Sequence, residues 1–216
     1  MAELFEQFRP GASGWFFMWA LLLTAAFMVA VAVERGYYVW VKANINSNKF
    51  MGEIRRLVRE RKFKQALALC ESAGDKALPR VVRAGLQRVT ESENPDFRAI
   101  QNSVDEGTLE VIPKLQQRTG TLAMIGNIAT LIGLMGTIYG LILAFDAVSG
   151  AGFDAAQKSA FLAAGISTAM NTTLMGLTIA VPAIIAYNFI NNKTLKIIDE
   201  IDEHTVKLIN LLTGDR

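Results

Sequence analysis

The amino-acid sequence predicts an all-α integral membrane protein with three transmembrane helices, a helical cytoplasmic domain and a C-terminal cytoplasmic helix. Three observations predict this class. Hydrophobic residues make up 51% of the 216-residue chain. The segments 14–33, 121–145 and 159–190 contain no Asp, Glu, Lys or Arg, and each reaches the ~20 apolar residues that cross a bilayer core of ~30 Å. The alternation of polar and apolar residues that is typical of strands does not stand out anywhere in the chain.

The first span, residues 14–33, is predicted to stay in the mature protein. A cleaved secretory signal has a basic start, an apolar core of roughly 7–15 residues and a cleavage site with small residues. The start of this chain contains the acidic Glu3 and Glu6 instead, and its apolar core is longer. We therefore expect a permanent helix preceded by a short segment, residues 1–13.

The distribution of basic residues predicts the orientation, because Lys and Arg near the ends of spans remain in the cytoplasm. The N-terminal segment has only Arg9, and the loop after the second span has only Lys158. Many basic residues follow the first span instead: Arg35, Lys42, Lys49, Arg55, Arg56, Arg59, Arg61, Lys62 and Lys64. The predicted order is 1–13 outside, 14–33 membrane, 34–120 cytoplasm, 121–147 membrane, 148–158 outside, 159–190 membrane and 191–216 cytoplasm.

The first cytoplasmic region is predicted to form short amphipathic helices that are interrupted at Gly74 and Pro79. A further helix is expected to start near Pro95 and Asp96 and to run toward the second span, with a kink at Pro113. The apolar rows that indicate these helices are Phe50/Ile54/Leu57/Val58, Phe63/Ala66/Leu67/Cys70, Val81/Val82/Leu86/Val89 and Ile100/Val104/Leu109/Ile112.

The third span is longer than a bilayer requires. Its 32 uncharged residues correspond to about 48 Å of helix at ~1.5 Å per residue. We therefore expect the helix to tilt, bend or protrude, with Pro182 as the bend site. A cytoplasmic tail helix is expected to follow over 193–212.

Several classes of function are disfavoured. The net charge of +2 gives no support to nucleic-acid binding, since the basic residues lie where the topology requires them. Cys70 has no intrachain partner for a disulfide and is expected to be a small buried hydrophobic residue. His204 follows four acidic residues, which we interpret as a solvated helix face rather than a metal site. No catalytic triad, phosphate loop or pair of catalytic acids is present, so neither an enzyme nor a cofactor is expected.

Small and polar residues distinguish the second and third spans from simple anchors. Gly126, Gly133, Gly136 and Gly140 in the second span, with Gly165, Gly176 and Pro182 in the third, are assigned to helix packing. Thr130 and Thr137 lie seven residues apart and share a helix face. Isolated hydroxyls in a membrane helix often only bond to their own backbone. The amide of Asn171 cannot be satisfied so easily, so this residue is expected to face protein or water. The cluster around it is a better candidate for lining a pore than the threonines of the second span, and it consists of Ser167, Thr168, Asn171, Thr172 and Thr173.

These residues carry a resemblance to a known family. The segments G-L-M-G-T-I-Y-G (133–140) and G-I-S-T-A-M-N-T-T-L-M-G-L-T-I-A-V-P-A (165–183), with Tyr187 and Asn188 after them, resemble the pore helices of the MotA/TolQ/ExbB ion-channel family. Residues 66–86 are similar as well. Three spans with a long first cytoplasmic loop match the ExbB/TolQ-like branch. Thr137 and Thr173 match the family's pore threonines. Thr168, in contrast, stands where ExbB and TolQ have Glu, so any role of that Glu cannot be assigned to Thr168.

The resemblance implies the channel-forming subunit of an ion-driven motor in the bacterial inner membrane. It implies a homopentamer around two copies of a single-span partner resembling ExbD or TolR. That partner is expected to carry the ion-binding Asp that this chain lacks. The expected ion-pathway residues are Thr130, Thr137, Thr168, Asn171, Thr172 and Thr173. The transported ion, H⁺ or Na⁺, and the driven process stay open, and a passive scaffold that clusters a partner helix is the alternative.

Overall fold

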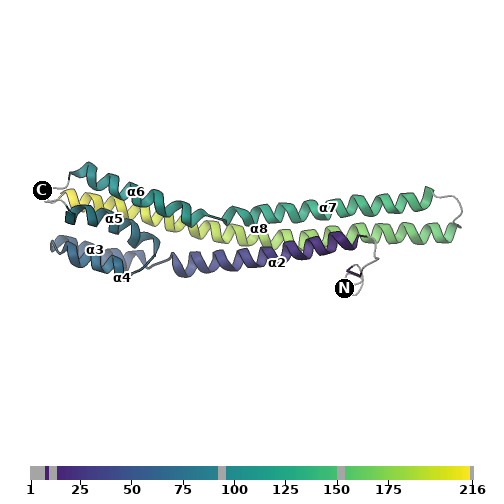
Figure 1. The fold of residues 1–216 in the computed structure, drawn as a ribbon, viewed down its shortest axis with the longest axis horizontal. Coiled ribbons are helices and arrows are strands. Elements are labelled where there is room, and N and C mark those ends of the chain that lie inside the picture. Colours follow the sequence, from purple (N-terminus) through teal and green to yellow (C-terminus); the bar gives the residue numbers. More distant parts are fainter. Residues whose placement is uncertain (1–7, 10–13, 92–95, 150–153, 215–216) are drawn as a thin grey trace. The chain divides into compact units, whose positions relative to one another are not determined.

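The computed structural model describes residues 8–9, 14–91, 96–149 and 154–214, and every regular element among them is helical. Three helices, α2, α7 and α8, are long and apolar enough to cross a membrane. These findings confirm the predicted fold class (Figure 1). In chain order the elements are α2 (Trp15–Tyr37), η1 (Tyr38–Lys42), α3 (Ser47–Arg59), α4 (Phe63–Ser72), α5 (Ala77–Glu91), α6 (Phe97–Gln116), α7 (Thr119–Ser149) and α8 (Ala155–Gly214).

The chain divides into two compact units. We call residues 1–33 and 118–188 the spanning unit, because they contain the three apolar segments. We call residues 34–117 and 189–216 the extramembrane unit, because they carry most of the charged residues. Helix α8 contributes its first part to one unit and its second part to the other.

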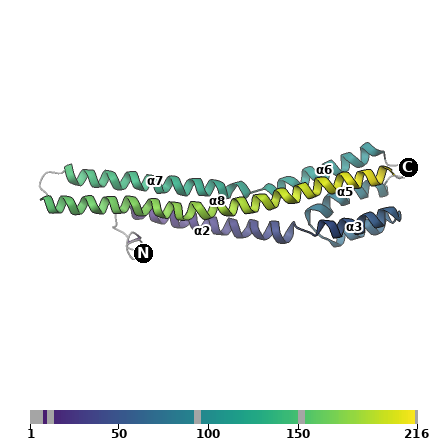
Figure 2. The same ribbon diagram turned by 180° about the vertical axis from the view of Figure 1, so that it is seen from behind.

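In the spanning unit, α2, α7 and the first part of α8 run side by side (Figures 1 and 2). A small apolar core joins all three helices. Leu21 of α2 packs with Ala129 of α7 and with Ile179 and Ala180 of α8, and all four side chains are buried. The remaining apolar surface of these helices is largely exposed in the single chain, which is typical of helices that face lipid or other transmembrane helices.

The third span and the predicted tail helix form one element. Helix α8 continues over 60 residues and contains Pro182, so the helix does not end between 190 and 193. Pro182 itself is exposed. A proline removes one backbone hydrogen bond, and neighbouring groups in a membrane helix compensate for that loss. The predicted helix over 193–212 is therefore present, as the direct continuation of the third span.

The predicted short helices of the extramembrane unit are present as α3, α4 and α5. Phe50, Ile54, Leu57 and Val58 of α3 are buried, as are Val81, Val82 and Leu86 of α5. Gly74 has a φ of +69° in the turn before α5, a conformation that glycine adopts at little cost. Pro79 does not interrupt a helix, contrary to the prediction. It lies in the first turn of α5, where a backbone N–H has no intrahelical acceptor, so its absence costs no hydrogen bond.

Cys70 on α4 is buried, as predicted, with 2% of its surface exposed. Burial away from water raises the pKa of its thiol to about 12, and the nearby Arg83 only partly opposes this effect. Because the thiolate is the reactive form of cysteine, Cys70 is an inert core residue.

Helix α6 ends earlier than the sequence suggests. Pro113 lies in its last turn, but the break before α7 comes at Gln117 and Arg118, and Arg118 has a φ of +60°. The apolar row also differs from the prediction, because Leu109 is 74% exposed. Ile100 and Val104 of the predicted row are buried, and the other buried positions are Gly107, Val111 and Leu115.

The C-terminal end of α6 is held by Arg35, which is only 4% exposed. Its Nη2 atom donates to the carbonyl oxygen of Leu115 at 2.5 Å, and its guanidinium lies 4.8 Å from the ring centre of Tyr38. The last four carbonyls of a helix lack intrahelical donors and carry partial negative charge. Arg35 therefore satisfies a carbonyl at this helix end and belongs to the core of the extramembrane unit.

His204 is buried, with 3% of its surface exposed, so the interpretation of this segment as a solvated helix face was wrong for this residue. Nη2 of Arg55 on α3 lies 3.2 Å from its Nδ1 atom. One helical turn earlier, Glu200 accepts a hydrogen bond from the hydroxyl of Ser47. Both contacts join α3 to the second part of α8, and α3 covers the ring.

Candidate functional site

The most polar contact inside the spanning unit joins Thr137 of α7 to Thr173 of α8, whose hydroxyl groups bond to each other directly. Oγ1 of Thr137 also lies 3.2 Å from the carbonyl oxygen of Gly133 and 3.4 Å from that of Ala169. Oγ1 of Thr173 lies 3.3 Å from the Gly133 carbonyl across the interface. Four oxygen atoms from two helices therefore meet inside the spanning unit.

Glycines allow α7 and α8 to approach closely enough for this contact. A methyl group added to Gly140 would lie 2.8 Å from backbone atoms of Ala169 and Gly165. One added to Gly136 would lie 2.6 Å from the side chain of Thr172, and one added to Gly176 would lie 2.7 Å from the Ala129 carbonyl. Gly133 and Gly165 lie in the same interface, so a Cβ atom at any of these five glycines would lie within 3.1 Å of α7 or α8 atoms across it.

The hydroxyl pair lies on the side of this interface that is turned away from α2. Ala129 and Ile179 face Leu21 of α2. At ~100° per residue, Thr137 is rotated by ~80° from Ala129, and Thr173 by ~120° from Ile179. The neighbouring Leu134 and Leu177 are 52% and 46% exposed. The surface beside the pair is thus not covered by the chain itself.

Thr168 and Thr172 point elsewhere. Thr172 is fully buried, packs against Gly136 and donates to the carbonyls of Thr168 and Ala169 at 3.1 Å and 3.0 Å. Thr168 is 3% exposed and donates to the Ala164 carbonyl at 3.0 Å. Both hydroxyls are thereby satisfied by their own helix inside the packed protomer.

Asn171 and Thr130 are more accessible. Asn171 is half-buried, and its Nδ2 atom lies 3.4 Å from the Ser167 hydroxyl on the same helix. Thr130 is exposed and donates to the Gly126 carbonyl at 3.1 Å. Of the six predicted ion-pathway residues, the structure therefore bonds Thr137 and Thr173 directly to each other. Thr172 shares the Ala169 carbonyl with Thr137 but is buried, and the other three make no hydrogen bond with the pair.

Sequence reasoning missed the carbonyl groups at this site. The carbonyl oxygens of Gly133 and Ala169 accept hydrogen bonds from the threonine hydroxyls. Every residue has such a carbonyl, so the residue types Gly and Ala do not indicate which carbonyls take part. The spacing contained a signal for Gly133, because it lies four residues before Thr137 and a threonine in a helix often bonds to that position. The cross-helix acceptor Ala169 required knowledge of how α7 and α8 pack.

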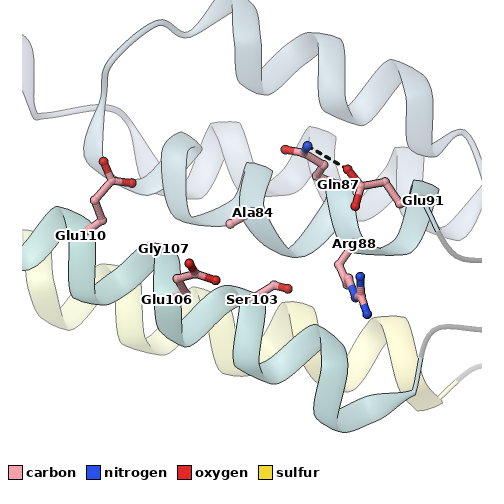
Figure 3. A pocket seen from close by; sticks show the side chains of 8 residues that line it. All are labelled: Ala84, Gln87, Arg88, Glu91, Ser103, Glu106, Gly107 and Glu110. Carbon is pink, nitrogen blue, oxygen red and sulfur yellow. Dashed lines mark hydrogen bonds between the residues drawn. The ribbon is translucent and has the colours of Figure 1, made fainter.

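A second polar feature is a cleft of about 280 Å³ between α5 and α6 in the extramembrane unit (Figure 3). Nε2 of Gln87 donates to Glu91 across its rim at 2.9 Å. Glu110 pairs with Lys114 and Arg80, and these two cations, Lys114 more strongly, lower the pKa of the Glu110 carboxyl. The residues that line the cleft include no histidine or cysteine. Within the described part of the chain, no group of three His, Cys, Asp or Glu residues is arranged to hold a metal ion.

Comparison with known proteins agrees with this arrangement. The family described as "MotA/TolQ/ExbB proton channel family" matches residues 73–203. The ExbB-like 3 protein of Synechocystis sp. is 27% identical over 178 residues, which cover 82% of this chain and 81% of that protein. The TolQ protein of Haemophilus influenzae is 40% identical over 77 residues, which cover 36% of this chain and 32% of that protein.

A solved structure of MotAB from C. jejuni has a TM-score of 0.66 and covers 95% of this chain and 79% of the matched chain. Its sequence identity of 16% means that this likeness concerns the fold alone. The match to the family, by contrast, extends over more than half of the chain and includes both α7 and the polar part of α8. The chain belongs to the MotA/TolQ/ExbB proton channel family.

Proposed function

We propose that this chain is the channel-forming, stator-like subunit of an ion-driven motor in the bacterial inner membrane. Family membership and three membrane-spanning helices support the proposal. The observation that carries it is the hydroxyl pair of Thr137 and Thr173 on the uncovered side of the α7–α8 interface. Thr137 and Thr173 are half-buried, and a helix that served only as an anchor would gain nothing from polar side chains on its uncovered side.

The chain itself has no group in its spans that takes up a proton. The three charge-free segments contain no histidine either, and Asp146 is an exposed residue near the end of α7. The titrating carboxylate must then come from another chain. We assign it to an Asp on a single-span partner of the ExbD/TolR type, held as two helices inside a ring of five copies of this subunit.

In this mechanism the threonine hydroxyls line a polar path beside the partner's carboxylate. A hydroxyl both donates and accepts hydrogen bonds, so it stabilises the ionised carboxylate and the hydrated proton that approaches it. Neutralising the carboxylates one after the other biases rotation of the partner pair within the ring. Each charge that crosses 100 mV releases about 2.3 kcal/mol, and successive crossings supply the work.

The proton is the proposed ion. Sodium has to exchange its water for several hard oxygen ligands, but Thr168 and Thr172 are buried inside the protomer, with 3% and 0% of their surface exposed. Thr137 and Thr173 are the two of the six predicted ion-pathway residues whose side-chain oxygens meet directly. This arrangement favours an ion that needs a titratable group rather than a cage of oxygens.

The proposed topology places residues 1–13 and 148–158 outside and residues 34–120 and 191–216 in the cytoplasm. The basic residues that follow the first span support this orientation, because short basic segments are retained on the cytoplasmic side. Most of the N-terminal segment and residues 150–153 of the loop lie outside the described residues.

The test replaces Thr137 or Thr173 by Val, which keeps the shape and removes the hydroxyl. The subunit is co-expressed with its single-span partner and purified, and proton flux is measured in proteoliposomes under an imposed potential. Each variant should assemble with five copies to two partner copies by mass and should lose at least about tenfold in flux, a barrier increase of about 1.4 kcal/mol.

Thr178→Val is the matched control, because the Thr178 hydroxyl is exposed and bonds only to the Leu174 carbonyl of its own helix at 2.8 Å. It should retain wild-type flux. If Thr137→Val and Thr173→Val conduct as well as the control, the hydroxyls serve packing only. An intact complex with no proton flux in the wild-type protein would favour the passive scaffold.

A further inference from the structure

The strongest unassigned feature of the molecule is a polar cleft of about 570 Å³ in the extramembrane unit. It lies between the start of α3 and the second part of α8, and its lining includes Asn46, Ser47, Asn48, Lys193, Lys196 and His204. We propose that this cleft binds the phosphate group of an anionic phospholipid. The proposal requires only that the chain spans a membrane and is independent of its role in ion transport.

Two lysines give the cleft unpaired positive charge. Lys193 and Lys196 lie on α8 and both line the cleft. In the part of the chain that the structure describes, neither ammonium group has a carboxylate within ion-pair distance. Unpaired lysines next to a membrane-spanning segment favour an anionic ligand such as a phosphate.

The first turn of α3 adds backbone donors on the opposite wall. Asn46 is the N-cap residue, and its side chain accepts from the backbone N–H of Lys49 at 3.2 Å. Ser47 and Asn48 also line the cleft, and their N–H groups, at the first positions of a 13-residue helix, have no intrahelical acceptor. Such N–H groups and the positive end of the helix dipole bind phosphate.

A buried histidine provides the independent sign of a ligand. His204 lines the cleft but is only 3% exposed. Arginine can only donate, so Arg55, at 3.2 Å, requires Nδ1 of His204 to be the acceptor. The ring is then neutral, and its proton is on Nε2. This N–H has no acceptor among the described residues. It is not one of the fully buried side-chain atoms that lack a partner, so it is open to the cleft that the residue lines and can donate to a ligand there.

Two carboxylates also line the cleft, and both are already engaged. Glu200 accepts from the Ser47 hydroxyl, and Glu203 pairs with Lys207, which lowers the pKa of the Glu203 carboxyl. Lys207 thus balances the charge of Glu203, and the two unpaired lysines face the single remaining carboxylate charge, that of Glu200. The donors that remain available are Lys193, Lys196, the His204 Nε2–H and the first N–H groups of α3.

The position along α8 indicates a lipid rather than a soluble phosphate. The charge-free run of α8 ends at Ile190, so Lys193 and Lys196 follow it by only ~4.5 Å and ~9 Å of helix. This is the depth of phospholipid headgroups. On the other chain segment that lines the cleft, the preceding residues include Tyr37 and Trp40, which are 58% and 45% exposed and are typical of the membrane interface.

The test uses the full chain purified in a mild detergent and measures retention of dioleoyl phosphatidylglycerol and dioleoyl phosphatidylcholine by native mass spectrometry. Wild-type protein should retain the anionic lipid preferentially. The double variant Lys193→Gln/Lys196→Gln should weaken this binding by about 25-fold, at about fivefold per lysine. The control Lys64→Gln/Lys76→Gln makes the same change in net charge outside the cleft and should bind as the wild type does. Equal losses in the two double variants would overturn the proposal.

Two histidine variants distinguish a ligand contact from a structural role. His204→Asn keeps an acceptor for Arg55 but lacks the Nε2 donor, and His204→Gln keeps a donor near Nε2 but lacks the Nδ1 acceptor. Phosphatidylglycerol retention should fall in the Asn variant and persist in the Gln variant, with folding checked by circular dichroism. The reverse order would show that the ring acts only through Arg55 and would refute its contact with the lipid.

Inorganic phosphate serves as the competing probe. Phosphate added at about 10 mM should leave phosphatidylglycerol bound to the protein, because the acyl chains of the lipid also contribute to its binding. Displacement of the lipid together with phosphate binding of similar strength would assign the cleft to a soluble phosphate compound and overturn the assignment to a lipid.

Discussion

Nη2 of Arg55 on α3 lies 3.2 Å from Nδ1 of His204 on α8, inside the extramembrane unit. A protonated His204 would place a second cation against the guanidinium. Burial of the ring lowers the pKa of His204 from its ordinary value of 6.5, the neighbouring Arg55 and Lys207 act in the same direction, and Glu203 and Glu200 oppose them. The neutral ring is therefore the form that the fold favours.

We expect the stability of this unit to fall when the pH drops below about 6.5. In the window between the lowered folded pKa and the ordinary value, the unfolded chain binds more protons than the folded chain, so stability increases with pH there. Apparent melting temperatures of the detergent-purified protein at pH 7.5, 6.5 and 5.5 measure this effect.

The control for this experiment is simple because the chain has a single histidine. His204→Asn retains an acceptor for Arg55 but has no proton to gain in this range, so its melting temperature should be nearly constant between pH 7.5 and 5.5. A pH dependence as steep as that of the wild type would show that other groups cause it.

The glycines of the α7–α8 interface should be intolerant of even one methyl group. A Cβ atom at position 140 would lie 2.8 Å from backbone atoms of Ala169 and Gly165, which no side-chain movement relieves. Gly140→Ala should cost about 1–3 kcal/mol, measured as a lower melting temperature in detergent.

Gly120→Ala is the matched control, since a Cβ atom at this position of the same helix meets nothing within 4 Å. It should leave stability unchanged or raise it slightly, because alanine has the higher helix propensity. The close-packed interface would be contradicted if both alanine variants melted at the same temperature.

The structure also decides how the topology should be tested. Cys70 is a poor reporter on either side of the membrane, because it is buried and its thiol has a pKa of about 12. We therefore choose a Cys70→Ala background with single cysteines at Ser149 and Gln101, which are both exposed. In intact cells an impermeant maleimide should label Ser149→Cys but not Gln101→Cys, and permeabilised cells should label both. Labelling of Gln101→Cys alone in intact cells would invert the proposed topology.

Much of the fold follows from one-dimensional patterns that local physics dictates. Charge-free runs predicted three spans, and apolar periodicity predicted the buried faces of α3 and α5, because burial of an amphipathic face requires only the helical repeat. The errors lie where tertiary contacts decide. The helix boundary at Gln117 and Arg118 and the burial of His204 under α3 depend on residues more than 70 positions away in the chain.

The candidate site shows the same division. Thr137 and Thr173 were singled out from the sequence, and the structure joins their hydroxyls. Thr168 and Thr172 have the same chemistry and lie in the same cluster of the chain. They differ only in the helix face they occupy, and that face packs against Gly14 and Gly136. Residue type therefore identified the polar cluster. The packing of α7 and α8 decides which of its threonines are buried, Thr168 and Thr172, and which remain available to an ion.

The last prediction concerns the ion itself. Function in sodium-free medium, with the membrane potential maintained, should equal function in sodium medium. The four oxygen atoms that meet at Thr137 and Thr173 are bonded to one another and are too few to replace the water shell of Na⁺. Proteoliposomes containing the subunit and its partner allow this measurement, with potassium as the only other cation.

A second experiment replaces Thr172, which is fully buried, by Val. Under a proton mechanism Thr172→Val should leave the ion requirement unchanged, since its hydroxyl bonds to carbonyls of its own helix. Loss of flux without sodium, restored by millimolar Na⁺ and weakened in Thr172→Val, would instead place a sodium site in the third span.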